Sequence, residues 1–179
     1  TGEFGPPIEG VPVVHGERQG GLLDVALSPN FQSDRTILWS YAEPRNGVNG
    51  TAVARGVLSP DGRRLSDVRV IFRAMPGYSN SAHYGSRLAF GPDGMLYITT
   101  GDRFDTARRV RAQRLDNHLG KVLRIAPDGS VPRDNPFAGE EGAMPEIWTL
   151  GHRNVQSLAF DPEGQLWLVE HGPRGGDEL

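Results

Sequence analysis

The chain has 179 residues, the length of one ordinary domain. Its 19 basic and 22 acidic residues give a net charge of -3 at pH 7, so no overall positive field attracts nucleic acid or an anionic membrane. The sequence has no cysteine, which excludes disulfides, zinc–thiolate sites, iron–sulfur clusters and cysteine nucleophiles. No apolar run approaches the roughly 18 residues that a membrane-spanning helix needs. We therefore expect neither nucleic-acid binding nor membrane insertion.

Short apolar runs separated by turn residues predict an all-β protein. The 24 glycines and 14 prolines mark many turns, among them Pro92-Asp93-Gly94 and Pro162-Glu163-Gly164. Between the turns, runs rich in aliphatic and aromatic residues alternate with a period of two, as strands do. The predicted strands are residues 22–27, 36–41, 68–72, 88–90, 95–99, 122–125, 157–160 and 165–169.

Two local signals complete the expected elements. Residues 106–119 place apolar side chains on one side and follow Asp105, a suitable N-cap, so they predict a helix inserted between strands. Asn49-Gly50-Thr51 fits an N-glycosylation sequon, but Asn-Gly is also a favoured turn pair. We expect a turn at Asn49-Gly50.

One sequence unit recurs along the chain. Residues 88–98 match residues 158–168 position by position, and residues 25–41 contain a looser copy. The copies begin 63 and 70 residues apart, which leaves room for four short strands and long loops, as in a β-propeller blade. Unrelated hairpins of a β-sandwich are the alternative. Propellers close with four to eight blades. We therefore expect residues 1–179 to be a partial β-propeller of about two and a half to three blades, the N-terminal half of a larger single domain.

The first polar cluster surrounds His83, which precedes one predicted strand, while Asp102 follows the next. A histidine at the mouth of a strand can act as a general base near neutral pH, and an aspartate beside it can orient the imidazole. An ordinary hydrogen-bonding histidine is the alternative.

Two further clusters follow. Gly151-His152-Arg153-Asn154 holds the equivalent place before the matching strand of the next repeat. The Arg153 guanidinium there could bind a carboxylate or a developing oxyanion. A salt bridge between blades is the alternative. In residues 170–178, the main-chain carbonyls of Gly172 and Pro173 lie near several carboxylates and could ligate calcium, although the pattern is not an EF-hand loop.

These clusters lie in motifs that resemble, in the same order, those of the glucose/sorbosone dehydrogenase family. Its members include soluble quinoproteins built as six-bladed propellers. The resemblance implies a pyrroloquinoline-quinone (PQQ)-dependent aldose sugar dehydrogenase. Such an enzyme oxidises the sugar at C1 to a lactone by hydride transfer to PQQ, with calcium as Lewis acid. The matching segments are residues 19–31, 83–88, 120–125, 134–136, 151–154 and 170–178.

The resemblance also implies a role for each matching residue. His83 would be the catalytic base that takes the proton of the anomeric hydroxyl, and Asp102 would support it. Arg153 would contact the quinone and stabilise its reduced oxygen, with Asn154 binding the cofactor alongside. Gln19 would hydrogen-bond the sugar.

The metal ligands are implied in the same way. The carbonyls of Gly172 and Pro173 would hold the cofactor-bound calcium, and Glu178 matches a carboxylate linked to structural calcium. One position departs from the pattern of the glucose-specific relatives. Ala82 stands where they carry an acidic sugar contact, which favours a broader range of aldoses. Lys121 belongs to a strand motif and does not replace the basic residues that later blades supply to the quinone.

The implied partner is an aldose, and the electron acceptor is left open. Because basic residues of later blades lie beyond these 179 residues, we expect the chain on its own to bind the quinone poorly and to be inactive. The resemblance to periplasmic enzymes implies a periplasmic or secreted protein. Two other functions remain: a non-catalytic propeller that binds a protein or glycan, and a metal-dependent lactonase on a six-bladed propeller.

Overall fold

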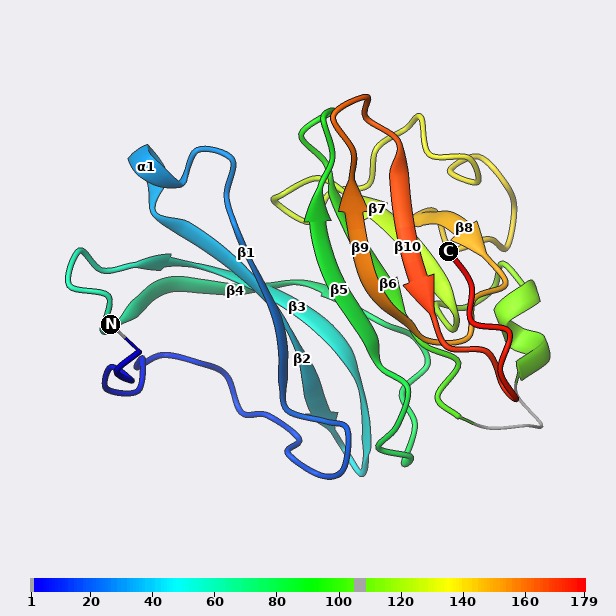
Figure 1. Ribbon diagram of the computed structural model, residues 1–179, viewed down its shortest axis with the longest axis horizontal. Helices are drawn as coiled ribbons and strands as arrows, with labels where there is room; N and C mark the ends of the chain where they lie inside the picture. Colours follow the sequence, from blue (N-terminus) through cyan, green and yellow to red (C-terminus); the bar gives the residue numbers. More distant parts are fainter. Residues whose placement is uncertain (1, 105–108) are drawn as a thin grey trace.

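The computed structural model describes residues 2–104 and 109–179, and strands dominate this part of the chain (Figure 1). Within it the strands form three antiparallel sheets, ordered β1-β2-β3-β4, β5-β6-β7-β8 and β9-β10. The first two sheets comprise β1 (Leu22–Leu27), β2 (Thr36–Arg45), β3 (Val48–Leu58) and β4 (Leu65–Arg73), then β5 (Gly85–Phe90), β6 (Leu96–Thr100), β7 (Lys121–Ile125) and β8 (Ile147–Leu150). The third holds β9 (Val155–Phe160) and β10 (Leu166–Glu170), and two short helices are α1 (Phe31–Asp34) and η1 (Arg109–Gln113).

Two four-stranded sheets and a pair of strands confirm the prediction of an all-β chain with about two and a half blades. All the predicted strands are present, several of them longer than the sequence indicated. Two strands, β3 and β8, were not predicted. In β3, two glycines and three polar side chains interrupt the apolar alternation, which weakens the sequence signal.

The turn expected at Asn49-Gly50 is wrong. The β2–β3 hairpin turns instead at Asn46-Gly47, where both residues have positive φ, 45° and 81°, as a two-residue type I′ turn requires. Asn49 lies inside β3 opposite Pro44 and is 2% exposed. A buried strand residue cannot accept a glycan, so the sequon is not a modification site in the folded protein.

The helix expected over residues 106–119 is also largely wrong. Residues 105–108 lie outside the described part of the chain, and the remainder holds only η1, a 3-10 helix of five residues. An α-helix continuing past η1 would need the carbonyls of Arg111 and Ala112 as acceptors. The Lys121 ammonium donates to both carbonyls, and the Gly151 amide also donates to the Ala112 carbonyl. None of the helices in the described residues is long and apolar enough to cross a membrane.

The first two sheets pack face to face around one apolar core. Alternation in β2 directs Leu38 into this core, where β3 adds Val53. The second sheet contributes Ile98 from β6 and Leu123 from β7 to the same cluster. Each of the three sheets has one edge strand on the same side, namely β1, β5 and β9. These three edge strands lie side by side, with β5 between the other two (Figure 1). Asp24 of β1 ties two sheets together, because its Oδ2 accepts the Leu88 amide of β5 at 2.9 Å.

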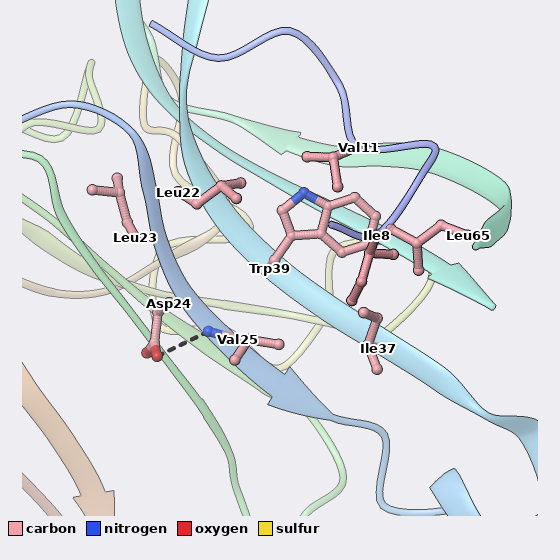
Figure 2. A pocket seen from close by; sticks show the side chains of 9 residues that line it. All are labelled: Ile8, Val11, Leu22, Leu23, Asp24, Val25, Ile37, Trp39 and Leu65. Carbon is pink, nitrogen blue, oxygen red and sulfur yellow. Dashed lines mark hydrogen bonds between the residues drawn. The ribbon is translucent and has the colours of Figure 1, made fainter. Parts of the chain in front are cut away.

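The opposite face of the first sheet is apolar as well. Trp39 and its neighbours on β2 form a second cluster, which residues of the N-terminal segment cover in part. Between them lies an open apolar pocket of about 370 Å³ (Figure 2). Leu22 and Val25 of β1 line this pocket and are each 61% exposed. The pocket is larger than the polar one described below, but it carries no chemistry-bearing group apart from Asp24, whose carboxylate points to β5.

Lys121, the only lysine in the sequence, is fully buried at the start of β7. Its ammonium donates to three main-chain carbonyls, those of Arg111 at 3.2 Å, Ala112 at 2.9 Å and Leu119 at 2.6 Å. Lys121 therefore fastens η1 and the following turn onto the second sheet. Burial lowers the pKa of Lys121 to about 8, against the opposing influence of the Asp116 charge.

This buried amine predicts a pH-dependent stability. Between pH 8 and pH 10 the unfolded chain binds more protons than the folded chain, because the lysine pKa is about 8 when folded and 10.5 ordinarily. The free energy of unfolding of the full-length protein should therefore rise across this range, relative to Lys121→Met, by about 2 kcal/mol. Denaturant titrations of both proteins at pH 8, 9 and 10 measure the difference. Parallel pH curves would contradict the assignment.

Candidate active site

The predicted site residues come from segments that meet at one end of the sheets. Gln19 precedes β1, His83 precedes β5 and Arg153 precedes β9. Asp102 follows β6 and Gly172 follows β10, which run antiparallel to β5 and β9. Because neighbouring antiparallel strands return to the same end, residues distant in the sequence converge there.

His83 and Asp102 form a buried pair, as the sequence predicts. His83 Nδ1 lies 2.7 Å from Asp102 Oδ1, and the two residues are 6% and 2% exposed. The Phe104 amide donates to the same oxygen at 2.8 Å, and the Phe104 ring stands edge-on to the imidazole at 4.7 Å. A carboxylate beside Nδ1 favours the tautomer protonated there, which leaves the Nε2 lone pair to accept a proton.

The main chain of His83 is held as firmly as its side chain. Its φ is 50°, in the left-handed region that costs a side-chain-bearing residue energy. The His83 amide donates to Gln19 Oε1 at 2.8 Å. Gln19 therefore lies at the site with its carbonyl oxygen already engaged, which leaves its NH₂ group as the donor for a sugar. That sugar contact stays a prediction.

Arg153 and Asn154 connect the third sheet to the second. The Asp102 amide donates to the Arg153 carbonyl at 2.8 Å, and the Gly85 amide donates to Asn154 Oδ1 at 2.9 Å. The Arg153 guanidinium donates through Nη1 to the His171 carbonyl at 2.9 Å. Its Nε is buried without a hydrogen-bond partner in the part of the chain that the structure describes. Arg153 and the Asn154 NH₂ group thus keep donors available for a ligand.

Glu170, at the end of β10, is a site residue that the sequence analysis gave no role. Its carboxylate accepts the amides of Arg153 at 2.6 Å and Asn154 at 3.0 Å and lies 3.2 Å from His152 Nδ1. Burial acts to raise the pKa of Glu170, but the bonds from His152 and from the two amides outweigh it and hold the pKa below its usual range. Glu170 is therefore ionised and fixes the loop that carries Arg153. An acidic residue ending a strand just before the polar cluster was the available signal.

The predicted calcium ligands lie in a tight turn after β10. A Cβ on Gly172 would approach the Gly175 carbonyl oxygen to 2.2 Å, so only glycine fits there. The Gly172 amide donates to Asp177 Oδ1 at 2.9 Å, and Glu178 pairs with Glu170 through main-chain bonds. No group of three or more acidic or histidine side chains is arranged around a common centre in the described residues. Calcium binding by the Gly172 and Pro173 carbonyls with Glu178 stays a prediction.

A polar pocket of about 270 Å³ collects most of these groups. Asp102, Arg109, Arg153, Gly172, Pro173 and Glu178 all contribute to its lining. His83, Gln19 and Asn154 do not line this pocket. His83 adjoins it through its bond to Asp102, and Gln19 bonds in turn to the His83 amide. Two guanidinium groups, an orphaned buried N–H on each and nearby main-chain carbonyls suit a ligand that carries carboxylates and a hard cation. The guanidinium N–H groups fit the carboxylates of PQQ, and the carbonyl oxygens fit calcium.

The close approach of the 101–102 loop to His83 predicts a sensitive glycine. A Cβ on Gly101 would lie 2.1 Å from the His83 carbonyl oxygen and 2.9 Å from Asn154 Oδ1. Gly101→Ala should therefore destabilise the full-length protein by about 1–3 kcal/mol, measured by denaturant unfolding. Gly139→Ala is the matched control, because nothing lies within 4 Å of its added Cβ. Equal unfolding midpoints for the two variants would show that the loop does not press on His83.

Comparisons with known proteins identify the family of the chain. A family profile described as glucose/sorbosone dehydrogenase matches residues 1–179. The Escherichia coli protein named aldose sugar dehydrogenase YliI is 47% identical over 175 residues, 97% of this chain and 46% of that protein.

Solved structures match equally well. The soluble aldose sugar dehydrogenase of Escherichia coli in its apo form has a TM-score of 0.91 at 47% identity, over 97% of this chain and 50% of that one. The PQQ-bound aldose sugar dehydrogenase of Streptomyces coelicolor has a TM-score of 0.75 at 33% identity, over 97% of this chain and 46% of that one. The chain thus spans about half the length of these relatives, and it belongs to the glucose/sorbosone dehydrogenase family.

Proposed function

We propose that the full-length protein is a PQQ-dependent aldose sugar dehydrogenase that oxidises its substrate at C1 to a lactone. The observation that carries this proposal is the buried His83–Asp102 pair, which adjoins a pocket lined by Arg153 and the Gly172-Pro173 turn. A general base, cationic donors and main-chain oxygens are the groups that such a reaction needs close together. A non-catalytic binding module would not require a histidine held against a buried carboxylate.

His83 supplies the proton-transfer step in this proposal. Oxidation of the anomeric carbon removes a hydride from C1 and a proton from the C1 hydroxyl. The proton passes to His83 Nε2, since Nδ1 is committed to Asp102 at 2.7 Å. The Asp102 carboxylate stabilises the imidazolium that forms and keeps the ring in its orientation.

The chemistry supplied by the bound group would be a hydride acceptor in PQQ and a Lewis acid in calcium. The residues of this chain bind and orient that pair. Arg153 can donate to carboxylate or developing oxyanion oxygens through its free N–H groups, and Glu170 keeps the Arg153 loop in place. The carbonyls of Gly172 and Pro173, with Glu178, are the candidates for holding calcium.

The substrate end of the site favours a broad aldose range. Ala82, next to His83, is 3% exposed and carries no polar group that could select one hydroxyl pattern. Gln19 is the nearest side-chain amide, fixed by its bond to the His83 main chain. We therefore propose an aldose substrate without strict selectivity for glucose, in a periplasmic or secreted protein.

Replacing the proposed base tests the mechanism directly. His83→Ala in the full-length protein should lower kcat for dye reduction by about 10²–10⁴-fold, the usual contribution of a general base. Asp102→Asn should also lower kcat, because the amide no longer favours the Nδ1-protonated tautomer. The PQQ affinity of both variants, followed by absorbance titration, should stay close to that of the wild type. An unchanged kcat in His83→Ala would remove His83 from the mechanism.

Metal removal tests the calcium assignment separately. PQQ binding to the full-length apoprotein should fail in EDTA and return on addition of calcium, because a hard cation held by main-chain oxygens is part of the proposed site. Equal PQQ affinity with and without EDTA would contradict the role of Gly172 and Pro173. The thermal unfolding midpoint in EDTA is the control that separates loss of the site from loss of the fold.

A further inference from the structure

We propose that Arg109 is a positioning residue that acts on His83 through the Asp102 carboxylate. Arg109 belongs to none of the sequence motifs that carry the predicted site residues. This inference rests on the proposed function, since it gives His83 the task of accepting a proton.

The two oxygens of Asp102 serve different partners. Oδ1 receives His83 Nδ1 at 2.7 Å and the Phe104 amide at 2.8 Å. Oδ2 faces Arg109, whose Nε lies 3.6 Å away, within ion-pair range but beyond a hydrogen bond. The carboxylate thus lies between an imidazole and a guanidinium.

Arg109 is held in this place by its anchored helix. It is the first residue of η1, and two carbonyls of η1 accept the buried Lys121 ammonium. The Gly151 amide bonds to the Ala112 carbonyl at 2.9 Å, which ties the same helix to the loop before Arg153. The Arg109 side chain is 39% exposed, lines the polar pocket and keeps its buried Nε without a hydrogen-bond partner among the described residues.

Other charged groups surround the pair without replacing Arg109. These groups lie on the neighbouring segments and are Arg103, His152, Arg153, Glu170, His171 and Glu178. Within the described residues, none of these six side chains bonds to the Asp102 carboxylate. Arg109 is therefore the cation that faces Asp102 directly.

The sign of the effect follows from the charges. The negative charge of Asp102 favours a protonated His83, which cannot accept a proton from the substrate. The positive charge of Arg109, 3.6 Å from the other carboxylate oxygen, offsets part of that field and so acts in favour of the neutral imidazole. Arg109 thereby opposes the effect of the Asp102 charge on His83 while leaving the bond that orients the ring in place.

A graded set of substitutions tests this balance in the full-length holoprotein. Arg109→Gln removes the charge, Arg109→Glu reverses it and Arg109→Lys keeps it. The acid limb of the kcat/KM profile should move to higher pH by about one pH unit in Arg109→Gln, further in Arg109→Glu, and little in Arg109→Lys. Arg114→Gln removes an exposed charge from the same loop and should leave the profile unchanged.

A second readout does not depend on activity. In the apoprotein, the His83 ring resonance, assigned by its loss in His83→Asn, should titrate at higher pH in the same order of variants. Coincident midpoints for wild type and Arg109→Glu would overturn the inference, even in an active dehydrogenase. Ordered midpoints in a protein without dehydrogenase activity would support the coupling and remove the proposed function instead.

Discussion

The functional end of the molecule depends on one ionised carboxylate that joins neighbouring segments. Glu170 gathers the amides of Arg153 and Asn154, and these two residues reach the second sheet through the amides of Asp102 and Gly85. Hydrogen bonds at the polar end of the stack therefore tie the third sheet to the second. Because such bonds require a specific geometry, the loop that presents the guanidinium is fixed relative to the imidazole.

Much of this architecture could be predicted from the sequence, because its strongest signals are local. Alternating apolar residues such as Leu38 and Ile98 mark core-facing strand positions, and proline–acid–glycine triplets mark the turns. The repeat gave the blade period, and the position of His83 before one strand and Asp102 after the next indicated that they could meet. The structure brings those two side chains to hydrogen-bond distance.

The features that escaped prediction depend on contacts distant in the sequence. Residues 106–119 have the pattern of a helix, yet Lys121 takes the carbonyls that a longer helix would need. Asn46-Gly47 and Asn49-Gly50 are equivalent as local turn signals, and only the pairing of β2 with β3 selects the first. Glu170 directly follows the predicted strand 165–169, and no local signal indicates that its carboxylate accepts the amides of the loop before β9.

The single buried amine has a practical consequence for anyone who couples such a protein to an electrode or a dye. Reagents directed at lysine need a solvent-accessible, unprotonated amino group, and Lys121 offers no accessible surface. Amine-directed conjugation should therefore leave the lysine of these 179 residues unmodified. Attachment points introduced by substitution at exposed positions, such as Arg114, would then be chemically unique within this part of the propeller.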